Sequence, residues 1–252
     1  MTPPVVLTIA GSDSGGGAGI QADLKTIAAL GGYGVSVVTA ITAQNTLGVT
    51  GIHPIPIEMV EAQLEAVLGD FPVAAVKVGM IGDRKVAELI LGLGERLPNL
   101  VVDPVLVATS GAKLADAAQV GPLLAYGCIL TPNRQEAAAL TRSPVETAEE
   151  MISAAVRLAE AGPRAVVVTG SELAVDVLRH GGETTILRGE AVATRNNHGS
   201  GCTFSSALAT RLAFGDDVPT AVSAAKRYVT AALRGGREWR LGAGPGPLNH
   251  FA

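Results

Sequence analysis

Apolar and polar positions divide most of the chain into short apolar runs and longer amphipathic stretches. The apolar runs are rich in Val and Ile and predict buried strands at residues 5–10, 35–43, 74–78, 100–102, 128–130 and 165–168. Between them, apolar residues recur at three- and four-residue spacing and predict helices at residues 20–30, 57–68, 84–93, 135–140 and 146–161. Strands that alternate with helices indicate βαβ units and a mostly parallel sheet.

The pattern changes after Thr169. Two short runs at residues 175–178 and 184–187 flank the sequence His-Gly-Gly-Glu and predict a β-hairpin. Two helices then follow, and residues 242–247 are expected to be irregular. Because no repeat, low-complexity linker or change of composition divides the sequence, we expect residues 1–252 to form a single α/β domain with three layers.

The composition narrows the classes of partner. Hydrophobic residues make up 48% of the 252 residues, which is enough for a large core. The net charge of −4 comes with basic residues that are scattered, which argues against a nucleic-acid or anionic-membrane partner and favours small molecules. Cys128 and Cys202 have no metal-ligand spacing, and the apolar run at residues 5–10 is too short for a signal peptide or a membrane span. We therefore expect a cytoplasmic protein.

The segment Asn-His-Gly-Ser-Gly-Cys-Thr at residues 197–203 is the strongest sign of chemistry. Apolar residues at helical spacing follow it until Gly215, so the segment lies at a predicted helix N-terminus. The first N–H groups of a helix lack intrahelical partners and carry about +0.5 of a charge, so they bind anions. The residues expected to receive a phosphate or a developing oxyanion are Gly199, Ser200, Gly201 and Cys202.

Polar clusters also follow several predicted strands. In an open parallel sheet, ligands bind beyond the carboxyl ends of the strands, so these clusters are expected to meet at one site. The glycine-dense residues 11–19 follow the first strand and match neither the dinucleotide-binding fingerprint nor the phosphate-binding P-loop. Asp23, in the next helix, is a candidate carboxylate for a substrate hydroxyl. Gln44, at the end of the second strand, offers a donor and an acceptor to the edge of a heterocycle.

Three further strand ends supply the remaining candidates. Met80 follows the third strand, where it is either a core residue or a contact for a flat ligand. Asp103 follows the fourth strand and is a candidate Mg²⁺ ligand, directly or through water. Asn133 and Glu136 follow the fifth strand, where they suit a helix cap. An amide beside a carboxylate at a strand end also suits the binding of phosphate and Mg²⁺.

Together these segments resemble the hydroxymethylpyrimidine/phosphomethylpyrimidine kinases of thiamine biosynthesis, within the ribokinase-like superfamily. The resemblance spans nearly the whole chain, and its most specific motifs are residues 10–23 and 198–203. The other segments that carry it are residues 42–46 (Thr-Ala-Gln-Asn-Thr), 77–80 (Lys-Val-Gly-Met), 103–105 (Asp-Pro-Val), 131–133 (Thr-Pro-Asn) and 246–250 (Gly-Pro-Leu-Asn-His). The resemblance implies a ribokinase-like three-layer α/β/α sandwich with a mostly parallel central sheet, and a homodimer.

The resemblance also implies roles for the candidate residues. The aminopyrimidine pocket would be lined by Gly11, Asp23, Gln44, Met80 and Val107. Mg²⁺ would be bound by Asp103 and Glu136, and the ATP phosphates by Asn133, Glu136 and Thr169. Cys202 stands where ribokinase relatives carry an Asp base, and a helix N-terminus lowers the pKa of a thiol, so Cys202 is a candidate base. The alternative is that Cys202 packs against the ring while Asp23 orients the hydroxyl.

The sequence departs from the family pattern at two positions. The strand that begins at Ala165 ends in Thr169-Gly170-Ser171-Glu172, where this family usually shows Lys-Gly-Gly-His. A cation that faces the phosphates is therefore expected to be absent at Thr169, with slower or altered catalysis as the result. Ser200 stands in place of a usual Thr and keeps the hydroxyl.

The function implied by the resemblance is an ATP- and Mg²⁺-dependent kinase. It would transfer the γ-phosphoryl group of ATP to 4-amino-5-hydroxymethyl-2-methylpyrimidine. A second transfer to the resulting monophosphate would give the diphosphate. The nearest alternative is a pyridoxine or pyridoxal kinase of vitamin B6 salvage. A pyrimidine-binding sensor without turnover is the alternative from another class, and a Mg²⁺ and phosphate apparatus argues against it.

Overall fold

A mixed β-sheet with helices on both faces organises the residues that the computed structural model describes, which are 2–106, 117–124 and 127–252. In the described part of the chain the sheet has nine strands in the order β3-β2-β1-β4-β5-β6-β7-β8-β9, of which β3, β8 and β9 run antiparallel to their neighbours. The strands are β1 (Val5–Asp13), β2 (Tyr33–Asn45), β3 (Gly48–Pro54), β4 (Val73–Val78), β5 (Leu100–Val102), β6 (Ile129–Leu130), β7 (Ala165–Gly170), β8 (Val175–His180) and β9 (Glu183–Arg188). The predicted α/β fold with a mostly parallel sheet is confirmed.

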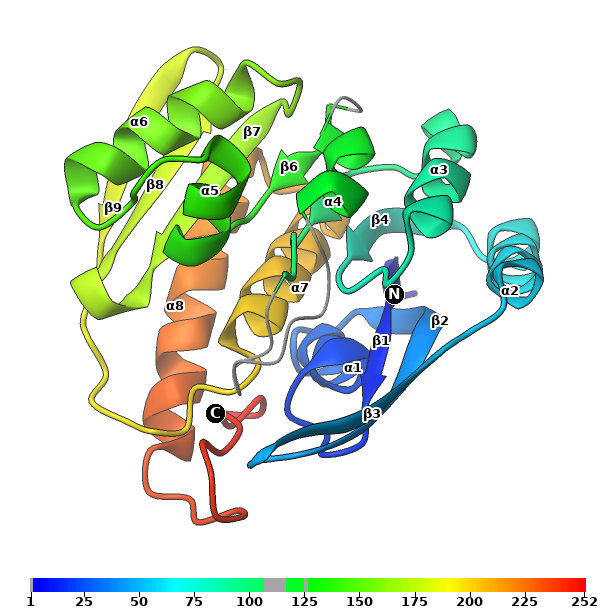
Figure 1. The fold of residues 1–252 in the computed structure, drawn as a ribbon, viewed down its shortest axis with the longest axis horizontal. Coiled ribbons are helices and arrows are strands. Elements are labelled where there is room, and N and C mark those ends of the chain that lie inside the picture. Colours follow the sequence, from blue (N-terminus) through cyan, green and yellow to red (C-terminus); the bar gives the residue numbers. More distant parts are fainter. Residues whose placement is uncertain (1, 107–116, 125–126) are drawn as a thin grey trace.

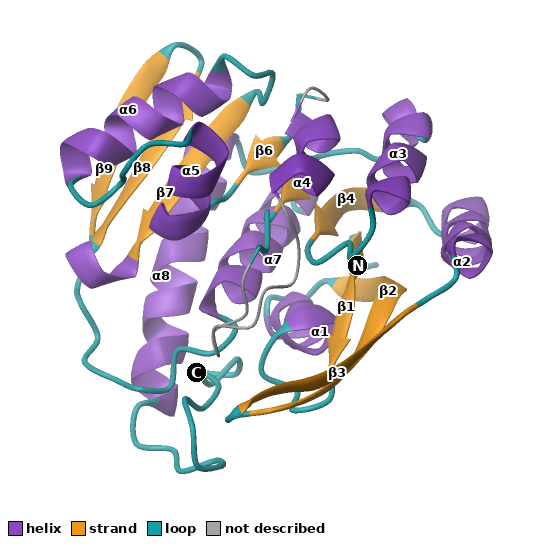
Figure 2. Cartoon of the chain, in the orientation of Figure 1, coloured by secondary structure: helices purple, strands orange, loops and turns teal. Residues whose placement is uncertain are grey.

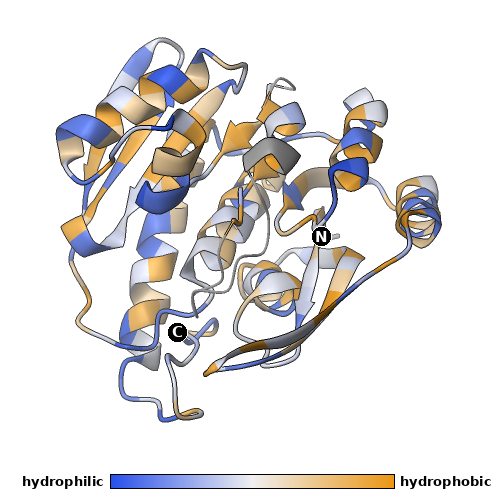
Figure 3. Ribbon diagram, viewed as in Figure 1, coloured by the Kyte–Doolittle hydropathy of each residue, from blue (hydrophilic) through white to orange (hydrophobic). Residues whose placement is uncertain are grey.

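The helices form the two outer layers. They are α1 (Gly19–Ala29), α2 (Ile57–Asp70), α3 (Arg84–Gly92), α4 (Ala117–Leu124), α5 (Arg134–Thr141), α6 (Ala148–Ala159), α7 (Ser200–Ala213) and α8 (Val218–Gly236). One apolar core joins the sheet to α2, α3, α5 and α6, and a second joins the opposite face to α1, α7 and α8 (Figure 1). Figure 3 shows that the helices carry both hydrophobic and hydrophilic residues, as expected for helices that cover a sheet. No helix among the described residues combines the length and hydropathy needed to cross a membrane.

Two elements were absent from the sequence prediction. Strand β3 pairs with the end of β2 and is mostly exposed, so it lacks the apolar pattern of a buried strand and depends on backbone hydrogen bonds to β2 (Figure 2). Helix α4 contains Pro122, which breaks the usual helical pattern. The predicted hairpin is present as β8 and β9, and its two turn residues, Gly181 and Gly182, have φ angles of 58° and 84°.

The first strand continues further than its apolar run. The strand was predicted at residues 5–10, but β1 extends to Asp13 after a register shift between Ala10 and Ser12. Short polar side chains are compatible with the strand because its end forms part of a ligand cavity. The irregular segment at residues 242–247 returns to this end of the sheet, where the Gly244 N–H donates to Thr46 Oγ1 at 3.1 Å. The N-terminal and C-terminal parts of the chain therefore meet beside the strand ends.

Candidate active site

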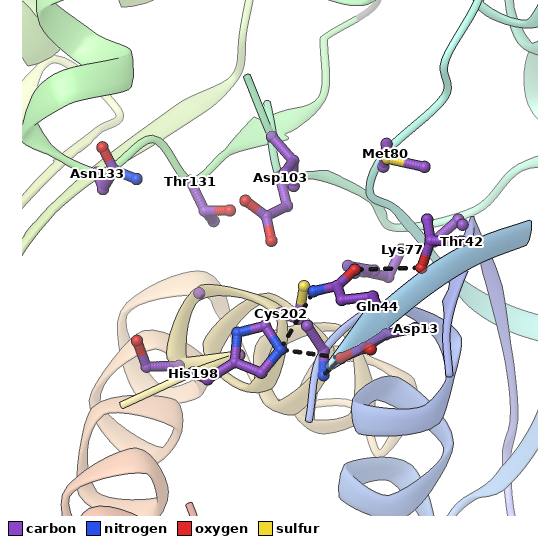
Figure 4. A pocket seen from close by; sticks show the side chains of 18 of the residues that line it. Asp13, Thr42, Gln44, Lys77, Met80, Asp103, Thr131, Asn133, His198 and Cys202 are labelled. Carbon is purple, nitrogen blue, oxygen red and sulfur yellow. Dashed lines mark hydrogen bonds and ion pairs between the residues drawn. The ribbon is translucent and has the colours of Figure 1, made fainter. Parts of the chain in front are cut away.

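A cavity lies at the carboxyl ends of β1, β2, β4, β5, β6 and β7, next to the N-terminus of α7. Figure 4 shows Asn133, Thr131 and Asp103 on one side of it and His198, Asp13 and Gln44 on the other. The predicted site residues on its wall are Gly11, Gln44, Met80, Asp103, Asn133, Glu136, Thr169, Gly199, Ser200, Gly201 and Cys202. The structure thus brings these residues together from segments that are far apart in the sequence. Val107 lies outside the described residues.

Asp13 organises the side of the cavity formed by β1 and β2. Its Oδ1 accepts the N–H of Gly15 at 2.8 Å, and its Oδ2 accepts the N–H groups of Gly17 and Ala18 at 3.1 and 2.9 Å. His198 Nε2 lies 2.9 Å from the same Oδ2. Burial acts to raise the pKa of Asp13, but the hydrogen bonds from His198, Ala18 and Gly15 outweigh it and lower the pKa below its usual value. The carboxylate is therefore ionised and saturated with donors.

Gln44 is held in the same network. Its backbone N–H donates to Ser14 Oγ at 2.8 Å, and Ser14 Oγ lies 2.7 Å from the Gln44 carbonyl oxygen. The side-chain amide lies between Thr42 Oγ1, at 3.1 Å, and His198 Nε2, at 3.4 Å (Figure 4). Both the backbone and the side-chain amide of Gln44 are therefore held by neighbouring groups, with the amide on the cavity wall.

Met80 and Gly11 form an apolar part of the wall. Met80 is only 8% exposed, and Thr39 Oγ1 donates to its carbonyl oxygen at 2.6 Å. A Cβ at Gly11 would lie 2.4 Å from Met80 Cε, so glycine at this position leaves room for the methionine side chain. Met80 is thus both a core residue and a wall residue, which answers the two possibilities raised by its position after a strand.

Asp23 is not on the cavity wall, which corrects the prediction that it lines the pocket. It is completely buried, and Lys77 Nζ lies 2.8 Å from both carboxylate oxygens. Thr8 Oγ1 and Ser206 Oγ donate to the same carboxylate at 2.6 and 2.7 Å. A carboxylate with all its acceptor sites in use cannot orient a substrate hydroxyl. The apolar spacing of the first helix did not reveal that this position faces inward.

Lys77, unlike its partner Asp23, lies on the cavity wall. It is completely buried, and it is the only lysine or arginine on the cavity wall among the described residues. Burial acts to lower the pKa of Lys77, but the negative charges around it, Asp23 first, raise the pKa well above its usual value. The cavity wall therefore contains a protonated lysine, paired with Asp23, that the sequence prediction did not include.

The opposite side of the cavity carries two buried carboxyl groups. Burial raises the pKa of Asp103, and the charge of Asp23 adds to the effect, against the opposing influence of Lys77 and a hydrogen bond from Ser205. Burial, followed by the charge of Asp103, raises the pKa of Glu136 to about 8. Asn133 and Glu136 also form the capping box of α5, with 2.9 Å hydrogen bonds in both directions. Thr169, whose N–H donates to Pro132 O at 2.9 Å, lies beside them on the wall.

This pair of carboxyl groups fits a Mg²⁺ site that is shared with phosphates. Among the described residues no group of three or more His, Cys, Asp or Glu side chains is arranged to hold a metal. Mg²⁺ is commonly bound by one or two carboxylates, with phosphate oxygens and water as its other ligands. Burial and, after it, the charge of Asp103 both disfavour the ionised form of Glu136, and a bound divalent cation would favour that form.

The predicted anion loop lies at a helix N-terminus. Helix α7 begins at Ser200, and its N-cap, Gly199, has a φ of 85° and no side-chain cap. The N–H of Ser200 donates to Asn197 O at 3.2 Å, whereas the N–H groups of Gly201 and Cys202 have no hydrogen-bond partner in the described part of the chain. A Cβ at Gly199 would lie 1.8 Å from Gly17 O, so only glycine allows the two loops to touch.

The thiol of Cys202 differs from the sequence prediction. Loss of solvent raises its pKa to about 12, and the opposing effect of Lys77 is smaller. The helix N-terminus was expected to lower this pKa, whereas the loss of solvent around the thiol, which a sequence does not report, raises it. The resting thiol is therefore protonated at neutral pH.

Comparisons with known proteins agree with this geometry. Residues 13–249 match the family described as phosphomethylpyrimidine kinase. The chain is 47% identical to the hydroxymethylpyrimidine/phosphomethylpyrimidine kinase of Rhizobium meliloti, with 98% of this chain and 97% of that protein covered. It is 48% identical to the thiamine biosynthesis bifunctional protein ThiED of Geobacter sulfurreducens over 98% of this chain, but it spans only 52% of the length of that protein.

The solved structure of Bacillus subtilis pyridoxal kinase, an ADP complex, is similar over 99% of this chain and 98% of its own. Its TM-score is 0.89 and its sequence identity is 36%. The fold is thus shared with a kinase whose solved structure holds ADP.

Proposed function

The chain belongs to the phosphomethylpyrimidine kinase family, and from this membership and the cavity we propose that it phosphorylates 4-amino-5-hydroxymethyl-2-methylpyrimidine and then its monophosphate. The product of the two steps is the diphosphate used in thiamine biosynthesis. The observation that carries the proposal is the cavity itself, where the amide of Gln44 faces Asp103 and Glu136 beside the N-terminus of α7. One end suits a heterocycle and the other suits nucleotide phosphates.

The substrate ring is proposed to lie between Gln44 and Met80. The amide would pair with the edge of the aminopyrimidine, and the thioether of Met80 would contact its face. Gly11 leaves the space in which Met80 adopts this position. The hydroxymethyl group would then point toward Cys202 and the loop before α7.

The nucleotide phosphates are proposed to lie against Asn133, Glu136 and Thr169. Asp103 and Glu136 would hold Mg²⁺, which neutralises charge on the phosphates when bound. Thr169 has no charge, so Lys77 is the side chain that supplies positive potential from beneath the cavity.

Transfer is proposed to occur over the first turn of α7. The hydroxymethyl oxygen would attack the γ-phosphorus of ATP, the bond between this phosphorus and the bridging oxygen would break, ADP would leave, and the hydroxyl proton would pass to water. The N–H groups of Gly201 and Cys202, which have no partner among the described residues, would stabilise charge on the transferring group, an effect typically worth about 10² to 10³ in rate per donor. A loose transition state requires little help from a base, so the protonated thiol of Cys202 is proposed to act by contact with the substrate.

Three broader properties are also proposed. Residues 1–252 form one kinase domain, because the family match runs through 13–249 and the described strands form a single sheet. The active form is a homodimer, as the resemblance to this family suggests, and light scattering tests this. The protein acts in the cytoplasm on small molecules, without a nucleic-acid or membrane partner, which accords with its scattered basic residues.

Vitamin B6 phosphorylation is the second candidate, because pyridoxal kinase shares this fold over nearly the whole chain. Pyridoxine has no amine beside a ring nitrogen, so it offers the amide of Gln44 a poorer partner than the aminopyrimidine does. We therefore expect weaker phosphorylation of pyridoxine than of hydroxymethylpyrimidine.

An assay of ADP release with Mg-ATP tests both candidates. Hydroxymethylpyrimidine and pyridoxine are supplied separately, and mass spectrometry counts the phosphates added to each. A pyrimidine diphosphate supports the proposal, and a product that stops at the monophosphate limits it to the first step. Pyridoxine phosphate alone would replace it with the vitamin B6 reaction. Binding of the pyrimidine without any ADP release would instead support the non-catalytic sensor.

A further inference from the structure

The side chains around Gln44 restrict how its amide can be oriented. Asp13 is ionised, so both of its oxygens can only accept hydrogen bonds. His198 Nε2, at 2.9 Å from Asp13 Oδ2, must therefore carry the hydrogen. The same N–H lies 3.4 Å from the end of the Gln44 amide, so that end faces a donor.

The other end of the amide faces an acceptor. Thr42 Oγ1 lies 2.9 Å from the carbonyl oxygen of Ser12, which can only accept, so the single hydroxyl hydrogen of Thr42 is used there. The free lone pair of Thr42 Oγ1 then faces the Gln44 amide at 3.1 Å. An amide nitrogen at this end and an amide oxygen at the His198 end satisfy every group.

Figure 4 shows the opposite arrangement, with the amide nitrogen beside His198 and the oxygen beside Thr42. It places two N–H donors against each other, and it makes two acceptors compete for one hydroxyl hydrogen. The two ends of a carboxamide have nearly the same shape, so a half-turn about the last side-chain bond removes both conflicts without moving other atoms. The hydrogen-bond network therefore selects the turned orientation.

We infer that the Asp13–His198 pair, together with Thr42, fixes the Gln44 amide with its oxygen toward His198 and its nitrogen toward Thr42, so that the cavity selects a ring that bears a primary amine beside a ring nitrogen. This inference rests on the proposed function and adds positioning residues to it. The amine donates to the amide oxygen, and the ring nitrogen accepts from the amide N–H. A ring with an oxo group beside a ring N–H has the reverse order and is rejected.

The orientation of the bound ring follows as well. The exocyclic amine lies on the His198 side, and the ring nitrogen lies on the Thr42 side. His198 comes from the segment before α7 and Thr42 comes from β2, so the ring is oriented by two elements that are distant in the sequence. His198 is a positioning residue here, because it acts through Gln44.

Replacement of His198 tests the inference by substrate discrimination. The substrates are hydroxymethylpyrimidine and its 4-oxo counterpart, which has a hydrogen on the ring nitrogen. Because a site built for specific hydrogen bonds strongly rejects a mismatched partner, the wild type should favour the amine by about 10³-fold or more in kcat/KM. His198→Met removes the N–H at similar side-chain size and should reduce this ratio at least about ten-fold. His198→Gln keeps an N–H toward Asp13 and should keep the ratio within about three-fold of the wild type.

A second matched pair examines the other end of the amide. Thr42→Val removes the acceptor and should also reduce discrimination, whereas Thr42→Ser keeps the hydroxyl and should preserve it. Circular dichroism and the thermal midpoint verify that each variant is folded. An amine-to-oxo ratio that is unchanged in both folded His198→Met and Thr42→Val overturns the inference.

Nitrogen NMR gives a readout that does not need turnover. The chain has four histidines, and the His198→Gln spectrum identifies the signals of His198 in protein labelled with ¹⁵N-histidine. A proton on Nε2 supports the inference, and a neutral ring with its proton on Nδ1 contradicts it. If the wild type phosphorylates neither pyrimidine, the kinase proposal fails, while the NMR result still decides whether His198 presents an N–H to the Gln44 amide.

Discussion

Each side of the cavity contains an aspartate. The two are buried to a similar extent, but their pKa values are shifted in opposite directions. Asp13 is 3% exposed and has a lowered pKa, whereas Asp103 is 4% exposed and has a raised pKa. The difference is the supply of donors, since Asp13 accepts from three backbone N–H groups and His198, and Asp103 lies near Asp23 and Glu136. The carboxylate of Asp13 has all its hydrogen-bond donors without a ligand, whereas the carboxyl groups of Asp103 and Glu136 have negative charge that a cation can neutralise.

Replacement of Asp103 should have the largest effect. Asp103→Asn should lower kcat/KM by about 10³-fold, because the cation and the phosphates lose a charged partner. It should also raise the thermal midpoint of the ligand-free protein at neutral pH, because burial penalises the ionised carboxylate that it removes. Steady-state kinetics and calorimetry measure the two effects.

Asp13→Asn is the matched variant on the other side of the cavity. Its thermal midpoint should fall at neutral pH, because the folded state stabilises the ionised form of Asp13. That contribution to stability should disappear as the pH falls through the lowered pKa. A change of the same sign in both variants would remove the contrast between the two sides.

Replacement of Gly199, where the two glycine-rich loops touch, should have the next largest effect on activity. Gly199→Ala should lower kcat/KM by about 10²-fold, because its Cβ would meet Gly17 O and displace the N–H groups of α7. Gly215→Ala is the control, since Gly215 also has a positive φ, 93°, but open space around its Cβ position. The control should lose about 1 kcal/mol in unfolding free energy and keep its activity. Equal losses of activity in both variants would leave only backbone strain as the cause.

The pH dependence of stability should reveal Glu136. Its pKa is about 8 in the folded protein, compared with an ordinary value of 4.5. Between these pH values the folded protein therefore binds the proton more tightly than the unfolded chain does. Stability from this group is therefore fully present below pH 4.5 and decreases as the pH rises to about 8. Glu136→Gln should weaken the dependence of the thermal midpoint on pH between these values, as measured by calorimetry. A profile identical to the wild type would contradict the raised pKa.

The smallest effect is expected at Cys202. With a pKa of about 12, its thiol does not act as a base at neutral pH, so Cys202→Ala should reduce kcat by less than about ten-fold. Single-turnover measurements isolate the transfer step. A loss of about 10² or more, with the base form visible in the pH profile, would restore the thiol to the role of base.

The sequence predicted the fold where burial imposes a pattern. The Val-rich runs that became β4 and β7 and the amphipathic spacing of α6 were all present as predicted, because each buries an apolar face. The strand β3 was missed, since exposed edge residues need no apolar pattern. Its stability comes from backbone pairing with β2.

Site residues could be predicted where a polar side chain lies directly after a predicted strand. Asp103 and Gln44 reached the cavity for that reason, whereas Asp23 was misplaced because the direction of a helix face relative to the strand ends is a property of the packed fold. His198 and Lys77 were missed for a related reason. Each gains its significance from a partner distant in the sequence, such as Asp13 for His198, and spacing along the chain does not show it.

The hydrogen bond between Asp13 and His198 joins residues 185 positions apart, which has a consequence for protein synthesis. A growing chain that has emerged only through β7 already contains Gln44, Asp103 and Glu136, but it lacks the imidazole that completes the network around Asp13. Contacts of such long range form only after the intervening chain has been ordered, and they contribute to slow folding. Under the proposed selection, the Gln44 amide is therefore oriented only after the segment that carries His198 has folded against Asp13.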